Sequence, residues 1–95
     1  MADLQTEHRR LLILQILQKD QDYSVNDDLL QKLLAAQGYG VALAVVRADL
    51  AWLEQVGLLS TNELPGVTVA LLRNEGVDVA TGVAVMPGVA RPRPA

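Results

Sequence analysis

Apolar residues recur at helical spacing in the N-terminal part of the chain, and polar stretches separate the repeats. Leucines at positions 4, 11, 14 and 17 lie on one side of a predicted first helix, and neighbouring aliphatic residues widen this stripe past half of the circumference. After a polar break, Asn26 is suited to cap a second helix, because its side chain can accept hydrogen bonds from free amides of the first turn. Gly38 suits a left-handed stop, so we expect the second helix over residues 27–37.

A third helical repeat and a hairpin follow. Val46, Leu50 and Leu53 recur at helical spacing, and Gly57 ends the pattern. Residues 58–63 and 67–72 flank a Pro-Gly pair that suits a turn, and they predict an antiparallel hairpin. Beyond it, NEGVDVATG predicts a short helix, and the proline-rich end VAVMPGVARPRPA predicts an extended or mobile tail.

Three helices followed by a two-stranded hairpin is the element order of the winged helix-turn-helix fold. We therefore predict a mainly α protein with a small β-hairpin, a short C-terminal helix and an extended tail. A chain of 95 residues has room for one domain. We place that domain at residues 1–82 and the tail at 83–95.

Particular residues add a family resemblance. The stretch VVRADLAWLEQVGLL, residues 45–59, is similar to the winged-helix signature in which a Val-Arg-x-Asp-Leu core precedes a Leu and then a Gly-Leu that enters the wing. With GVDVATG and PGVARP nearer the C-terminus, the chain resembles the small winged-helix proteins encoded by Mu-like phages and prophages, which are related in fold to ArsR-type repressors. The resemblance implies a dimer in which the third helix is the recognition helix and the hairpin is the wing.

The charge balance argues against general attraction to nucleic acid. The formal net charge is −3 and the sequence pI is near 4.9. Phosphate binding depends on concentrated Lys and Arg, so this balance opposes non-specific binding to DNA or anionic lipid, although it leaves room for a local basic patch. The apolar run at residues 11–14 is flanked by polar and charged residues. We therefore expect neither a signal peptide nor a membrane span, and a cytoplasmic protein.

The predicted third helix is poor in side chains that read nucleic acid. Bases and phosphates are contacted by donors and acceptors, but the outward positions are almost all Ala or Leu. The candidate interaction face comprises Ala42, Leu43, Ala44, Ala48 and Ala51. Arg47 is the one basic residue of the helix. A single arginine–guanine contact gives about 1–3 kcal/mol of discrimination, whereas specific recognition needs about 4–10 kcal/mol.

Arg47 also has a structural interpretation, as the partner of a nearby acid. Asp49, Glu54 and Glu75 are the candidate partners. Trp52 has two interpretations as well: it packs under the wing or at a dimer seam, or it anchors a partner protein.

If DNA is bound, basic residues elsewhere must supply most of the attraction, because the hairpin contains Glu63 and no Lys or Arg. The candidate DNA-contacting residues are Arg47, Lys32, Arg9, Arg10, Arg91 and Arg93. For the two terminal arginines, the alternative is a solvated tail.

The broad apolar surface of the first helix predicts self-association. A chain of this size buries only about two thirds of its unfolded surface, so a second copy is a reasonable source of further burial. We expect a homodimer formed by the first helix and the C-terminal segment. The predicted interface residues are Leu4, Leu11, Leu12 and Ile16.

The sequence contains no pattern typical of an enzyme, a metal site or a cofactor site. It has no cysteine and a single histidine, His8, so neither a thiolate zinc site nor ArsR-type metal sensing is expected. No paired nucleophile and base or phosphate-binding loop is present. We expect no catalysis, no cofactor and no bound metal.

Two functions remain open. The first is a homodimeric phage transcriptional regulator that docks its third helix in the major groove of DNA. The second is a winged-helix interaction module whose Ala/Leu face binds a phage or host protein.

Overall fold

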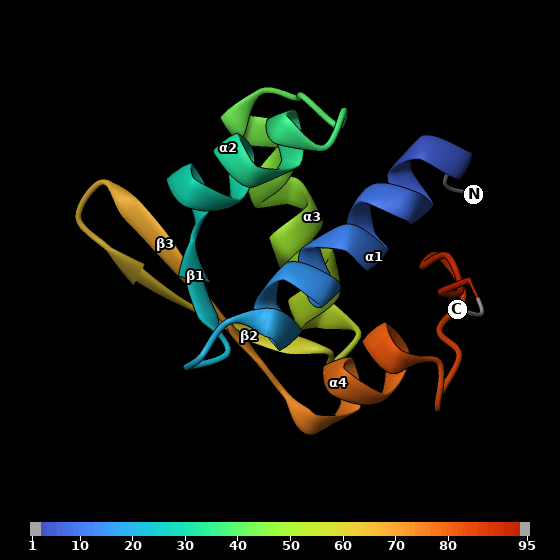
Figure 1. Cartoon of the computed structure of the whole chain (residues 1–95). Coiled ribbons are helices and arrows are strands. Elements are labelled where there is room, and N and C mark those ends of the chain that lie inside the picture. The colour runs from blue at the N-terminus through green and yellow to red at the C-terminus, as the bar shows by residue number, and fades with distance from the viewer. Residues whose placement is uncertain (1–2, 94–95) are drawn as a thin grey trace.

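The computed structural model describes residues 3–93 (Figure 1). Over this range the elements are α1 (Leu4–Lys19), β1 (Ser24–Asn26), α2 (Asp27–Ala36), α3 (Leu43–Gln55), β2 (Leu59–Leu64), β3 (Val67–Leu72) and α4 (Asn74–Thr81). The strands form one antiparallel sheet in the order β1-β3-β2. Residues 1, 2, 94 and 95, which the predicted domain and tail include, lie outside the described residues.

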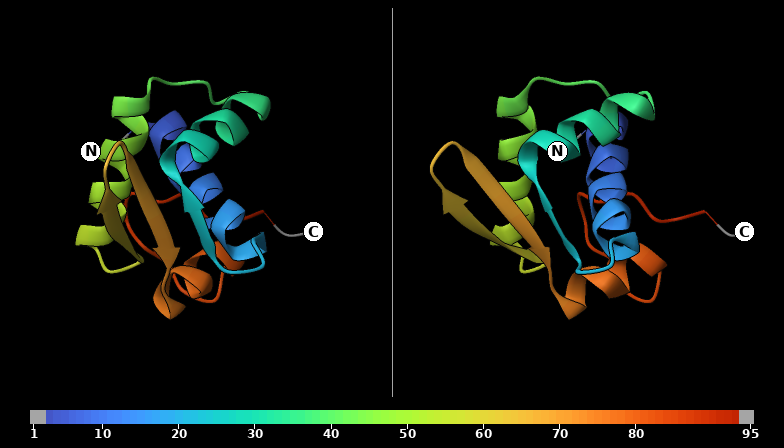
Figure 2. Two further views of the ribbon diagram at one scale, coloured as in Figure 1. Left: turned by 90° about the vertical axis from the view of Figure 1, so that its left-hand side faces the viewer. Right: turned by 60° about the vertical axis from the view of Figure 1, so that its left-hand side comes forward.

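The core fills the space between the helices and one face of the sheet. Its fully buried side chains are mainly aliphatic and include Ile13, Leu14, Leu17, Leu30, Leu34, Val46 and Leu53. Burial of each such side chain stabilises the fold by about 1.5–3 kcal/mol. The β2–β3 hairpin lies beside α3 and its tip projects from the body of the protein (Figure 2). The core therefore holds one side of α3 and leaves its opposite side, next to the hairpin, open.

The predicted helices and hairpin are present with small shifts of their ends. The Asn26 side chain accepts a hydrogen bond from the Leu29 amide at 2.8 Å, which confirms the predicted cap. Gly38 has a φ of 89°, as the predicted left-handed stop requires. The hairpin belongs to a three-stranded sheet, so the predicted mainly α fold is corrected to a mixed α/β fold. β1 has no signal in the sequence, because three residues are too few for a periodic pattern.

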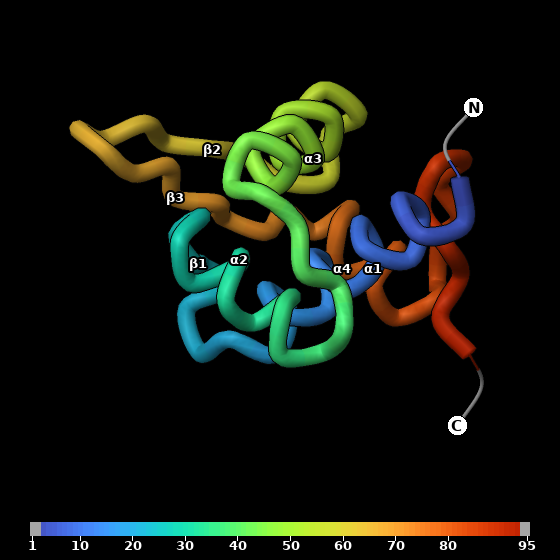
Figure 3. Tube along the Cα trace, turned by 90° about the horizontal axis from the view of Figure 1, so that it is seen from above, coloured from blue at the N-terminus to red at the C-terminus, as the bar shows by residue number. Residues whose placement is uncertain are grey.

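The segment predicted as an extended or mobile tail is packed against the helices. Val89 is buried, and the Ala90 amide donates a hydrogen bond to the Glu7 carbonyl at 3.1 Å. A Cβ on Gly82 would lie 3.2 Å from the side chain of Pro92, so the two ends of this segment meet. Ends that lie close together are a feature of an Ω-loop. Figure 3 shows this segment beside the N-terminal half of α1. Part of the predicted tail thus packs on the helices, through Val89 and Ala90, and residues 82–92 are called the Ω-loop below.

No helix among residues 3–93 is long and apolar enough to cross a membrane.

Candidate functional site

The exposed side of α3 carries small, uncharged side chains. Ala44, Ala48 and Ala51 are exposed and lie opposite the buried residues of the helix, and they are called the alanine stripe below. Ala42 is exposed and begins the helix without a side-chain cap, whereas Leu43 is half-buried. The structure therefore brings the predicted interaction face together, with Leu43 partly withdrawn from solvent.

Arg47 lies beside the alanine stripe and pairs with an acid from another helix. Its Nε donates to Oδ2 of Asp27, the first residue of α2, at 2.7 Å. The Asp27 side chain is completely buried, while that of Arg47 is 47% exposed. The predicted partners Asp49, Glu54 and Glu75 are therefore wrong. The actual partner lies 20 residues earlier in the sequence, and helical spacing carries no signal for such a pair.

The Asp27 carboxylate is stabilised as an anion despite its burial. Burial alone would raise its pKa. The pKa is nevertheless held below its ordinary value, because the carboxylate accepts hydrogen bonds from the Arg47 side chain and from the Thr68 and Asp28 amides. The positive charge of Arg47 lowers the pKa further. The same hydrogen bond raises the pKa of Arg47. One buried carboxylate thus joins α2, α3 and the part of β3 next to the hairpin turn.

A second carboxylate fixes the other strand of the hairpin to α3. Glu54 accepts hydrogen bonds from the Thr61 amide at 2.9 Å and the Thr61 hydroxyl at 2.8 Å. These two bonds lower the pKa of Glu54. They also occupy a backbone amide on the free edge of β2, where an unpaired group could otherwise recruit another strand.

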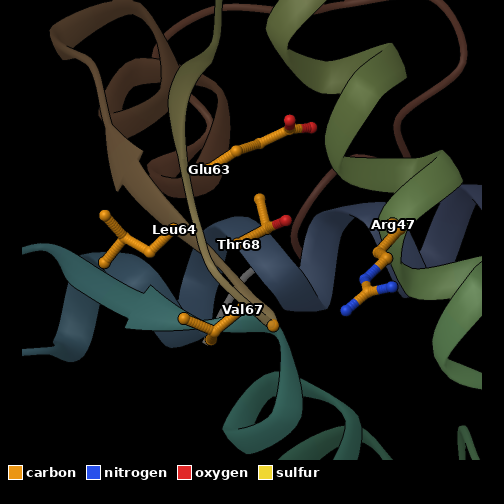
Figure 4. Close-up of a pocket in the computed structure, with 6 residues that line it drawn as sticks. Arg47, Glu63, Leu64, Val67 and Thr68 are labelled. Carbon is orange, nitrogen blue, oxygen red and sulfur yellow. The ribbon is translucent and has the colours of Figure 1, made fainter.

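A groove of about 260 Å³ separates α3 from the hairpin. It is lined by Arg47, Glu63, Leu64, Gly66, Val67 and Thr68. In Figure 4, Glu63 and Thr68 point toward α3, whereas Leu64 and Val67 point to the opposite side of the strands. A smaller hollow of about 120 Å³ continues along α3 past Glu54 and Thr61. Arg47 is the one cation lining either hollow, and it is accompanied by two glutamates.

Arg9 and Arg10 are placed inside the protein, which corrects their predicted role in phosphate contact. Arg9 is buried and donates two hydrogen bonds to the buried Asp49. The Nε of Arg10 lies 3.5 Å from the same carboxylate, and its guanidinium carbon lies 3.9 Å from the centre of the Trp52 ring. The Ω-loop covers this group, because Arg10 also donates to the Gly88 carbonyl at 3.1 Å. Trp52 and Asp49 therefore have internal roles.

The other predicted basic contacts are exposed but not gathered beside α3. Lys32 is exposed on α2, and Arg91 and Arg93 are exposed near the end of the described chain. That end leaves the protein on the side of α1 remote from α3 (Figures 2 and 3). The structure thus disperses the cations that a DNA-binding face would have to concentrate.

The predicted dimer residues of α1 do not form a common surface. Leu11 is buried in the core of its own chain, and Leu12 and Ile16 pack partly against that core. Leu4 is 73% exposed at the start of the helix. The broad apolar surface of α1 is therefore explained by packing within the chain and not by a dimer, because α2, β3 and α4 all contact this helix.

Within residues 3–93, no group of three or more acidic or histidine side chains is arranged to hold a metal ion.

Comparisons with known proteins place the chain among phage proteins. No family model matches it. It is 42% identical over 92 residues to gp26 of Escherichia phage Mu, described as an uncharacterized protein, and the match covers 97% of this chain and 95% of gp26. An uncharacterized protein of Haemophilus influenzae is 32% identical over 62 residues, which covers 65% of this chain and 60% of that protein.

A solved structure shares the fold. A chain of the complex structure of hsRosR-S4 matches with a TM-score of 0.63 at 23% sequence identity, over 75% of this chain and 61% of that chain. The predicted relation to ArsR-type repressors stays a prediction, whereas the resemblance to proteins of Mu-like phages is confirmed. The chain belongs to the family of the phage Mu protein gp26.

Proposed function

We propose that the protein is a winged-helix interaction module of a Mu-like phage, in which α3 and the β2–β3 hairpin form the working face and the partner is a protein. The match to hsRosR-S4 supports the architecture. The position of α3, held by the core on one side and open beside the hairpin on the other, supports its role as the contact element.

The observation that carries this proposal is the chemistry of the open side of α3. The alanine stripe offers no hydrogen-bond donor or acceptor to a base or phosphate. The Arg47 charge is balanced by Asp27 at 2.7 Å, and Glu63 lies on the same groove. A surface that approaches phosphates needs more positive than negative charge, and the groove beside α3 has no such excess.

Small side chains favour an α-helix as the contacting element of the partner. The distance between two packed helix axes is set by the side chains between them. Alanines at 44, 48 and 51 recur at helical spacing, so a partner helix with an aliphatic face could approach closely along the stripe. The groove beside it would accept the longer side chains of that helix.

Site-directed photo-crosslinking tests this proposal. A benzophenone side chain replaces Ala48 in phage-producing host cells, and the adducts are separated and identified by mass spectrometry. Position 84, an exposed alanine of the Ω-loop, carries the same group as the control. We expect a discrete protein adduct at position 48 that is absent at position 84. Adducts to DNA, equal labelling at both positions or no adduct at all would contradict the proposal.

A second candidate function is DNA-binding regulation, and one observation favours it. Asp27 engages Nε of Arg47, while that side chain remains 47% exposed beside the wing. A buried carboxylate can hold a guanidinium in one orientation for contact with a guanine or phosphate. This candidate requires a salt-dependent affinity for duplex DNA that is lost in Arg47→Ala.

A further inference from the structure

The side of the sheet remote from α3 faces away from the helices (Figure 2). Thr68, Ala70 and Leu72 point toward the helices, because Thr68 lines the groove and the other two are buried. Strand residues alternate between faces, so Val67, Val69 and Leu71 lie on the opposite side. Residues that pair directly across the strands lie on the same face of the sheet. The partners of these three residues on β2 and β1 are Ser60, Asn62, Leu64, Ser24 and Asn26. These residues are called the outer sheet face.

The central row of the outer sheet face, which β3 supplies, is apolar. An antiparallel sheet with one solvated face normally alternates apolar and polar residues. In VTVALL, the sequence of β3, both faces are mainly aliphatic, which is typical of a strand that is buried on both sides. Leu64 and Leu71 are nevertheless 48% and 47% exposed. The strand composition therefore fits a state in which this face is covered.

We propose that a second copy of the chain covers the outer sheet face in a two-fold contact. In such a contact each residue meets the same patch on the partner, so a charged patch would meet like charge. The net charge of −3 makes two copies repel each other in general. None of the outer-face residues in the three described strands is charged. Two copies that meet through this face therefore bring no like charges into direct contact.

The neutral polar residues make the face complementary to itself. Ser and Asn side chains each contain a donor and an acceptor, so either can pair with its own kind across a two-fold axis. They flank the aliphatic row of β3 on both sides, through Ser60 and Asn62 on β2 and Ser24 on β1. An apolar centre with a polar border is the usual anatomy of a protein interface.

The small size of the face limits the strength of this contact. A strand of six residues is about 20 Å long, and neighbouring strands lie about 4.8 Å apart. The face therefore falls short of the roughly 800 Å² per partner that a stable standard interface buries. We expect dimers that form at high concentration and dissociate on dilution, as complexes with small interfaces do.

Sedimentation equilibrium of the full chain tests the proposal. We expect a mass that rises from 10.2 kDa toward twice that value with concentration. Leu71→Lys places a charge on the exposed face and should raise the dimer dissociation constant at least about tenfold. Ala48→Lys, on the alanine stripe, is the matched control and should leave it unchanged. Circular dichroism verifies that both variants are folded. A wild-type monomer at about 0.5 mM, or equal effects of the two variants, would overturn the proposal.

A cysteine placed on the face gives an independent readout, because the chain contains none. Val69 lies on the central strand, so Val69→Cys would bring two thiols close to the two-fold axis. Under mild oxidation we expect disulfide-linked dimers from Val69→Cys and none from Ala48→Cys. Linkage through Ala48→Cys alone would show that copies meet through α3 and would contradict the proposal. Neither experiment depends on the partner proposed for α3.

Discussion

Two arginine–aspartate pairs join α3 to the rest of the protein, and they differ in how far water reaches the arginine. In the Arg9–Asp49 pair both side chains are enclosed, at 10% and 4% exposure. In the Arg47–Asp27 pair the aspartate is completely buried but the arginine is 47% exposed. The enclosed pair holds α1 against α3. The open pair holds α2 and the hairpin against α3, and it leaves part of the Arg47 guanidinium at the surface. The same two residue types therefore form a purely internal link in one pair and a link with an exposed cation in the other.

Loss of the shared carboxylate in the enclosed group should have the largest effect. Asp49→Ala leaves the buried Arg9 and Arg10 without their anion, and removal of one partner of a buried pair costs about 3–5 kcal/mol. Urea denaturation followed by circular dichroism measures this loss. Asp78→Ala, at an exposed position, is the control. A loss below about 1 kcal/mol would mean that the enclosed charges are better solvated than their burial indicates.

Neutralisation of the open pair should have a smaller effect. Asp27→Asn keeps the size of the side chain but removes the charge that Arg47 and two backbone amides share, so we expect a loss of about 2–3 kcal/mol at neutral pH. Thermal unfolding measures it, and the midpoint should fall by roughly 10–20 °C. An effect as large as that of Asp49→Ala would erase the distinction between the two pairs.

The same aspartate should shape the response to acid. Its pKa is lowered in the folded state from an ordinary value of 3.8. The stabilisation is therefore fully present above about pH 4 and is lost as pH falls through the lowered pKa. Stability measured between pH 6 and 2.5 should decline less steeply in Asp27→Asn than in the wild type. Parallel profiles would show that other carboxylates control the acid transition.

A glycine substitution probes how the Ω-loop closes the enclosed group. Gly88 has a φ of 95°, and a Cβ there would lie 2.7 Å from the Trp52 ring. Gly38 has a similar φ of 89° with no atom within 4 Å, so Gly38→Ala reports the backbone cost alone. Gly88→Ala should be about 1 kcal/mol more destabilising than this control. It should also shift the fluorescence of the single tryptophan to longer wavelength. Identical spectra and stabilities would contradict close packing of the loop on Trp52.

The smallest effect is expected at the edge of the hairpin. Glu54→Gln weakens the hydrogen bonds to Thr61, and because Glu54 is exposed the loss should stay below about 1 kcal/mol. Hydrogen exchange should nevertheless accelerate at the Thr61 amide and not at the Thr68 amide. Acceleration at both amides would indicate that Glu54 holds the whole hairpin and not β2 alone.

The helices of this protein could be predicted because their signals are local. Apolar spacing, the Asn26 cap and Gly38 all act within a few residues. The strand β1 could not be predicted, since it exists through pairing with β3 about 45 residues later. The partners of Arg47 and Arg9 were missed for the same reason, because a buried carboxylate selects its arginine through tertiary packing. The packing of the proline-rich end could not be predicted, because Ala90 contacts α1 and Gly88 lies beside Trp52 of α3, and the composition of the segment does not reveal such distant partners.

Titration of a labelled mixed-sequence DNA duplex tests whether Asp27 and the alanine stripe leave α3 without the chemistry to bind DNA. At about 50 mM salt, phosphate-driven binding is strong enough to be visible if it exists. The wild type and Arg47→Ala should both leave the duplex free at tens of micromolar protein. Micromolar binding that weakens with salt and is lost in Arg47→Ala would contradict this account and assign α3 to DNA.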